Sequence, residues 1–173
     1  QLHVRDLSHF RSRSYWLRRM ENHDRTERVP VDEYTIEHIM PQNEDMRPEW
    51  KTMLGEEWER IHGMRLHTLG NLTLTGYNTE YSDRPFHEKR DMKGGFAESP
   101  LRMNAGLGSL EVWDEDAIVA RAERLAEVAS MVWDSPKAES LNLSEFQPPK
   151  QAEPTQYTLD SYPQLKSEAV KAL

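Results

Sequence analysis

A short stretch in the first half of the chain holds residue types that suit phosphodiester hydrolysis. Glu37 and His38 are adjacent, and Asn71 and Asn78 follow them. The reaction needs a group that takes a proton from water, which an imidazole with a pKa near ambient pH can do. It also needs stabilisation of the charge on phosphorus and on the leaving oxygen, which a divalent cation can supply. A hard ion such as Mg²⁺ keeps several waters, so Glu37 and Asn78 would suffice as its protein ligands.

The elements around these residues predict a small hairpin crossed by a helix. Residues 34–36 have the β-branched and aromatic character of a strand that ends at Glu37 and His38, and residues 72–75 alternate as a half-buried strand does. A turn at 76–78 and a short helix over 84–93 follow. A helix laid across the hairpin would bring Asn78 against Glu37. His38 would face a different partner, because neighbouring strand residues point to opposite sides.

Longer helices are predicted on both sides of the hairpin. Apolar residues at helical spacing predict helices over 3–24 and 48–62, and Asp114 is a suitable N-cap for another. We therefore expect an α+β fold, with a hairpin-plus-helix core embedded in a mostly helical domain over residues 1–134. Residues 135–156 hold four prolines and little periodic apolar content, which predicts a linker or strap. Residues 157–173 would begin a C-terminal extension.

Several separated motifs occur in an order that resembles a known family. The chain reads Ile-Glu-His-Ile-Met-Pro-Gln at 36–42, His-Thr-Leu-Gly-Asn-Leu-Thr-Leu at 67–74 and Pro-Phe-His-Glu-Lys at 85–89. Trp113, Ile118, Arg121 and Trp133 follow. This order resembles the HNH (ββα-metal, His-Me finger) nuclease motif, which also occurs in RNA-guided DNA nucleases. It is most similar to the C-terminal domain of GmrSD-type modification-dependent (type IV) restriction proteins, including SspE-type phage-defence proteins linked to phosphorothioate DNA. The likeness covers about residues 1–135.

The resemblance implies a metal-dependent DNA endonuclease domain that nicks or cuts both strands. It implies that His38 activates water, that Glu37 and Asn78 hold a divalent metal, Mg²⁺ with Mn²⁺ as the alternative, and that Asn71 pins the loop and orients the histidine. The implied candidates for contact with DNA phosphates are Lys89, Arg90, Arg84 and His67. The implied partners are double-stranded DNA and a nucleotide-dependent sensing domain on the N-terminal side. Asn71 and Asn78 are closer in sequence than the corresponding residues of many HNH proteins, which leaves the second ligand open.

Composition limits the class of protein and the kinds of site that are compatible with this chain. Its 173 residues are enough for one domain with a core, and the absence of cysteine excludes disulfides and Cys-based zinc sites. No apolar run approaches the roughly 20 residues of a membrane span, and there is no initiator Met. We therefore expect a soluble, cytoplasmic domain cut from a longer protein. The net charge is −8, yet residues 1–30 carry seven arginines and four acidic residues. These arginines would form either a DNA-facing strip or a solvated face.

Other interpretations of the same residues stay open. Glu37 can be a group that holds the imidazole rather than a metal, and His67 can be a structural histidine beside the hairpin. His62 is expected at the surface, and Gly70 is expected to need a positive φ angle. The whole chain could also be a catalytically silent HNH-like module that binds DNA or protein, or a helical interaction domain with an incidental hairpin.

Overall fold

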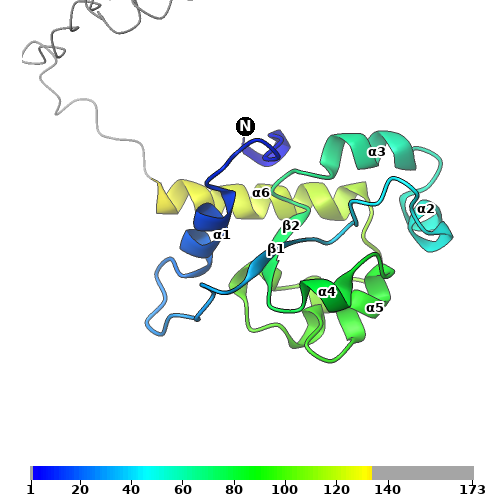
Figure 1. Cartoon of the computed structure of the whole chain (residues 1–173). Helices are drawn as coiled ribbons and strands as arrows, with labels where there is room; N and C mark the ends of the chain where they lie inside the picture. The colour runs from blue at the N-terminus through cyan, green and yellow to red at the C-terminus, as the bar shows by residue number, and fades with distance from the viewer. Residues whose placement is uncertain (1, 134–173) are drawn as a thin grey trace, which may run out of the picture. The chain divides into compact units, whose positions relative to one another are not determined.

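The computed structural model describes residues 2–133, which form an α+β fold and so confirm the predicted fold class (Figure 1). The helices are α1 (Arg13–Glu21), α2 (Pro48–Leu54), α3 (Trp58–Arg65), α4 (Asn78–Tyr81), α5 (Phe86–Asp91) and α6 (Glu115–Val132), and the strands are β1 (Thr35–His38) and β2 (Leu72–Thr75). Short 3-10 helices are η1 (Leu2–Val4), η2 (Phe96–Glu98), η3 (Arg102–Asn104) and η4 (Leu107–Ser109). None of the helices in this part of the chain is long and apolar enough to cross a membrane. The predicted linker over 135–156 and the extension over 157–173 lie outside the described residues.

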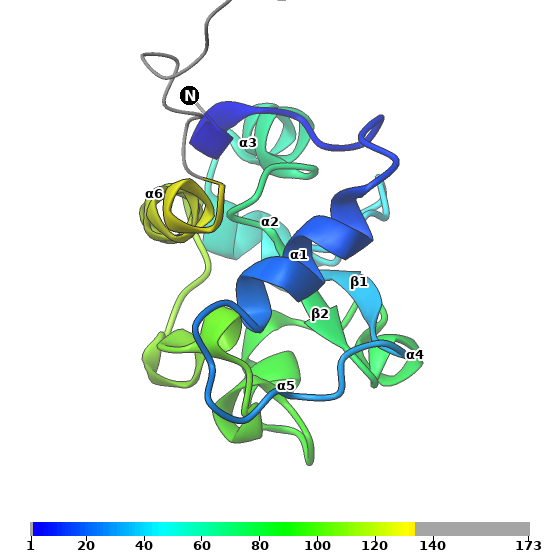
Figure 2. The same cartoon turned by 90° about the vertical axis from the view of Figure 1, so that its left-hand side faces the viewer.

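The two strands form an antiparallel sheet that has helices around it. The register pairs Thr35 with Thr75 and His38 with Leu72. α1 packs against β2 and α4 packs against β1, and Figure 2 shows α1 crossing in front of both strands. The residues that join the strands carry α2 and α3 (Figure 1). The sheet is therefore held by tertiary packing rather than by a tight turn.

The predicted helix over 3–24 is wrong in its first half, because regular α-helix begins only at Arg13. Asp6 instead forms an isolated antiparallel bridge with Thr68. The backbone N–H of Leu7 donates to the carbonyl of His67 over 2.9 Å. Pairing with a distant segment overrides local helical periodicity here. As a result, the N-terminal segment lies beside the residues that precede β2.

The helix predicted over 48–62 is two separate helices, because the helical conformation is interrupted at Gly55. This glycine has a φ of 78°, which is the left-handed region that glycine adopts without steric cost. Its N–H donates to the carbonyl of Lys51 and closes α2. The break lets Trp50 of α2 and Ile61 of α3 join the same buried cluster.

α6 fixes the turn that leads into β2. Asp114 caps this helix as predicted, with its side chain accepting a backbone N–H. The helix passes so close to Gly70 that a Cβ there would lie 2.2 Å from the carbonyl oxygen of Ile118. Gly70 does not have a positive φ, so that expectation is wrong and the close approach is the reason for glycine. Arg121 is buried and donates to the carbonyls of Leu69, Gly70 and Leu72.

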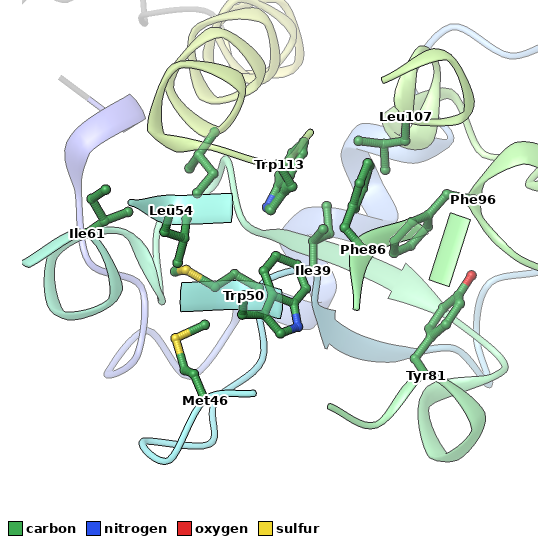
Figure 3. Close-up of a cluster of buried hydrophobic side chains, with 12 residues drawn as sticks. Ile39, Met46, Trp50, Leu54, Ile61, Tyr81, Phe86, Phe96, Leu107 and Trp113 are labelled. Carbon is green, nitrogen blue, oxygen red and sulfur yellow. The ribbon is translucent and has the colours of Figure 1, made fainter. Parts of the chain in front are cut away.

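Two clusters of buried side chains hold the sheet in place. Figure 3 shows the first, in which Trp50, Phe86 and Trp113 pack near Ile39, the residue after β1. The rings of Phe86 and Trp113 stack with centroids 5.5 Å apart. The second cluster packs the leucines of β2 against α1 and α6; its members include Leu17, Leu72, Leu74, Leu125 and Ala129. The end of β1 is therefore anchored in the core, although it also reaches a cleft.

Candidate functional site

The C-terminal end of β1 holds Glu37 and His38 in fixed positions. Their exposed fractions are only 4% and 8%. The strand pairing continues one residue beyond β1, because the N–H of Ile39 donates to the carbonyl of Asn71 over 3.0 Å. The acid and the imidazole are thus presented by rigid backbone rather than by a loose loop.

The side chain of Asn71 ties the loop after β1 to the turn before β2. Its Oδ1 accepts the N–H of Met40 at 2.7 Å and the indole N–H of Trp113 at 3.2 Å. Its Nδ2 donates to the carbonyls of Met40 and Leu66, each at 3.0 Å. Asn71 is fully buried, so it acts on His38 only through the backbone that follows it.

The imidazole of His38 contacts a second imidazole. His38 Nε2 lies 3.1 Å from Nδ1 of His67, and the two rings are nearly perpendicular. Burial, together with smaller contributions from the charges of His67 and Arg13, lowers the pKa of His38 to about 3. His38 is therefore neutral at pH 7 and carries a lone pair that can accept a proton.

The lowered pKa of His38 predicts a loss of stability in acid. Below pH 6.5 the unfolded chain binds a proton at His38 that the folded chain does not, so stability falls as the pH drops toward 3. Between pH 7.5 and pH 5 we expect the wild type to lose about 2 kcal/mol more unfolding free energy than His38→Gln. Urea unfolding of both proteins at the two pH values measures this. Equal losses in both would show that His38 is not held neutral.

Glu37 forms a buried ion pair with Lys89 of α5. The Lys89 ammonium lies 2.6 Å from Glu37 Oε1 and also donates to the carbonyls of His38 and Ile39. Burial raises the pKa of Glu37 to about 6, against the opposite influence of the Lys89 charge. Burial likewise lowers the pKa of Lys89, against the influence of Glu37. Both shifts have burial as their largest cause, and we take the pair as ionised because the lysine gains a carboxylate and two carbonyls.

A cleft of about 260 Å³ opens at the end of β1. It is lined by Glu37, His38, Pro41, Gln42, Asn43, Asn78, Ser82 and Asp83. The structure thus brings three of the predicted site residues, Glu37, His38 and Asn78, to one hollow. Asn71 lies behind this hollow in the core.

The amide of Asn78 is oriented by the edge of β1. Its Nδ2 donates to Oγ1 of Thr35 and to the carbonyl of Ile36, each at 3.1 Å. A carbonyl can only accept, so the NH₂ side of the amide must face it. No donor within residues 2–133 contacts Oδ1 of Asn78. This oxygen remains available as a ligand.

The structure gives the predicted phosphate-binding residues different surroundings. Lys89 has an exposed fraction of 0% and its ammonium is paired with Glu37, so this structure gives it no free surface for contact with a phosphate. Arg90 is largely buried, where it pairs with Asp91 and donates to the carbonyl of Leu110. Arg84 precedes α5, is half-exposed and is paired with Glu88 of that helix. Contact of Arg84 or Arg90 with DNA stays a prediction.

Two residues of the site were missed or misplaced by sequence analysis. His62 is buried rather than at the surface, and its Nε2 lies 3.0 Å from the carbonyl of Pro41. Asp83 lines the cleft and is paired with Arg47 at 2.9 Å. The sequence position of Asp83, just before the Pro-Phe motif, could have indicated that it lies near the site, because the turn between α4 and α5 must pass the hairpin.

Comparison with known proteins identifies one family. The model of the family described as "GmrSD restriction endonucleases, C-terminal domain" matches residues 3–128, which is most of the chain. No curated protein and no solved structure matches the chain.

Proposed function

This chain belongs to the family of C-terminal domains of GmrSD restriction endonucleases, and from that premise we propose that it hydrolyses DNA as an HNH-type, metal-dependent nuclease. The family makes it an endonuclease domain of a restriction protein. The observation that carries the finer proposal is the single cleft shared by Glu37, His38 and Asn78. These residues supply a base and two oxygen ligands beside a groove open to solvent. The hairpin, α4 and α5 would form the ββα-metal unit.

His38 is the general base of the proposed reaction. Its Nε2 faces His67, and we assign the proton between the rings to His38. His38 Nδ1 then accepts the proton from a water in the cleft. A phosphate bound nearby stabilises the protonated ring, which raises the low pKa of His38 toward the range where proton transfer is efficient. Asn71 is a positioning residue, since it fixes the backbone after His38 without reaching the cleft.

Glu37 and Asn78 fit a hard divalent cation, Mg²⁺ or Mn²⁺, by the chemistry of their oxygens. Glu37 gives Oε1 to Lys89, which leaves Oε2 as a ligand, and Asn78 offers Oδ1. Within the described part of the chain, no group of three or more His, Cys, Asp or Glu side chains is arranged to hold a metal. Mg²⁺ retains several waters and needs fewer protein ligands than that. When bound, the cation would stabilise charge on the phosphate and on the leaving oxygen.

The proposed cut has little sequence preference of its own. Phosphates carry no sequence information, and a site that engages its substrate at the scissile phosphate reads no base edge. Discrimination of modified or foreign DNA would then belong to a nucleotide-dependent sensing domain on the N-terminal side. Restriction of phage DNA is the role that follows.

A catalytically silent DNA-binding module is the second candidate. It is favoured by the ion pair with Lys89, which neutralises Glu37 and so weakens its attraction for a cation. Incubation of the 173-residue chain with supercoiled plasmid separates the two. A nuclease nicks or linearises the plasmid with Mg²⁺ or Mn²⁺ and stops in EDTA. A silent module retards the plasmid in a gel under both conditions and cuts it in neither.

Replacing Asn78 by alanine tests the proposed second ligand. We expect Asn78→Ala to raise the Mg²⁺ concentration for half-maximal nicking by about tenfold or more, since a ligand oxygen is lost. Asn78→Asp keeps an oxygen but loses the two hydrogen bonds that orient the side chain, so its Mg²⁺ requirement should lie between those of Asn78→Ala and the wild type. The matched control is Thr79→Ala, because Thr79 is exposed and does not line the cleft. An unchanged Mg²⁺ requirement in Asn78→Ala would place the second ligand elsewhere, with Asp83 as the next residue to replace.

A further inference from the structure

Arginines within residues 2–133 differ in whether they pair with acidic side chains. Six of them form ion pairs with acidic side chains; these are Arg25, Arg47, Arg60, Arg65, Arg84 and Arg90. Within residues 2–133, five arginines on or near α1 form no ion pair; these are Arg11, Arg13, Arg18, Arg19 and Arg28. A protein with a net charge of −8 has ample acid to neutralise them. Three of these arginines, Arg18, Arg19 and Arg28, lie around one groove.

This groove lies between α1 and the segment that leads into β1. The groove has a volume of about 440 Å³, and Tyr15, Arg18, Arg19 and Arg28 lie in its lining. Tyr15, Arg19 and Arg28 are exposed. Arg18 donates to the carbonyl of Tyr34 over 3.0 Å, which holds its guanidinium beside β1. Asp32 also lines the groove, so three cations face one acidic residue there.

The start of α1 is connected to the end of β1 through a chain of contacts. Arg13 donates to the carbonyls of Leu7 and Ser8. The N–H of Leu7 donates to the carbonyl of His67, whose ring contacts His38. At 1.5 Å per residue, α1 is about 13 Å long, which is roughly four phosphate steps along a DNA strand. α1 thus has the length and the charge to follow a nucleic-acid backbone that leaves the cleft.

We propose that the α1 arginine face, made of Arg18, Arg19, Arg28 and Tyr15 around this groove, binds the sugar–phosphate backbone of duplex DNA next to the phosphate that is cut. This assignment rests on the proposed nuclease function, since it names how that substrate is held. The contacts would be independent of sequence, because guanidinium and hydroxyl groups on phosphates read no base. The binding should depend strongly on salt, because each neutralised phosphate releases condensed counterions.

The test is binding of a fluorescently labelled 25-base-pair duplex to the 173-residue chain in EDTA, followed by anisotropy from low to moderate salt. Arg19→Gln/Arg28→Gln removes two charges from exposed side chains that make no hydrogen bond within residues 2–133, so the fold should be kept. The charge-matched control is Lys51→Gln/Arg60→Gln, which removes two charges on α2 and α3. We expect the first variant to bind at least about tenfold more weakly at low salt. Its log–log salt slope should be smaller by about 2.

The outcomes distinguish this proposal from the proposed function. If both double variants bind as the wild type does, or weaken equally, the α1 arginine face is not the DNA site. If the wild type nicks plasmid and both variants nick it equally at moderate salt, the proposed nuclease function is supported and the proposed DNA-binding surface is contradicted. If binding depends on Arg19 and Arg28 but the wild type never cuts plasmid, the proposed DNA-binding surface is supported and the proposed nuclease function is contradicted. A wild type that binds no duplex overturns both.

Discussion

Replacing His38 by alanine is expected to lower the rate of plasmid nicking by about 10²- to 10⁴-fold, the range that a positioned general base contributes. The reason is that His38 is the imidazole that lines the cleft beside Glu37 and Asn78. Burial and the neighbouring charges lower its pKa to about 3, so it is unprotonated over the whole physiological range. Single-turnover nicking at saturating Mg²⁺ measures this loss directly.

A histidine elsewhere provides the control for this experiment. His87 is exposed on α5 and does not line the cleft, so His87→Ala should nick at the wild-type rate. The unfolding midpoint of His38→Ala should be recorded in parallel, because His38 is buried and its removal can loosen the end of β1. A folded His38→Ala protein that nicks within about threefold of the wild type would contradict the role of His38 as base.

Replacing Lys89 by methionine is expected to destabilise the protein by about 3–5 kcal/mol, because it leaves a carboxylate buried without its partner. Lys89 has no exposed surface, and it supplies donors to Glu37 and to the carbonyls of His38 and Ile39. Without the lysine, the pKa of Glu37 should rise further above 6, so that its ionisation opposes folding. The cost should therefore be larger at pH 8 than at pH 5.

Urea unfolding followed by tryptophan fluorescence measures the effect of Lys89→Met. Lys93→Met is the matched control, since Lys93 is exposed and should change stability by less than about 0.5 kcal/mol. Glu37→Gln/Lys89→Met removes both charges and should recover part of the loss. If Lys89→Met unfolds within about 1 kcal/mol of the wild type, the ion pair does not hold the end of β1 as described.

The fold was predictable where local chemistry decides the structure. The alternation of residues 72–75 and the cap at Asp114 indicate a strand and a helix start without tertiary information, and both are present. The helix over 3–24 failed because Asp6 pairs with Thr68, a contact between segments far apart in sequence. The helix over 48–62 failed at Gly55, because apolar periodicity continues across a residue whose φ ends the helix.

The candidate site was likewise predictable from sequence only in part. Glu37 and His38 could be singled out from sequence because strand and motif place them together, and Asn78 follows at the start of α4. The burial of Lys89 could not be predicted from sequence, because a lysine on a short polar helix gives no sign that its ammonium contacts a carboxylate 52 residues earlier. The contact of His67 with His38 likewise depends on how the segment before β2 lies against β1.

The most direct test of the account is chemical rescue of His38→Gly on supercoiled plasmid with Mg²⁺. The variant removes the imidazole and leaves space at the end of β1. We expect His38→Gly to nick poorly, and we expect added imidazole, but not imidazolium at acid pH, to restore a measurable part of the rate. Wild-type nicking by His38→Gly without imidazole would contradict the claim that the ring at this position takes the proton from water.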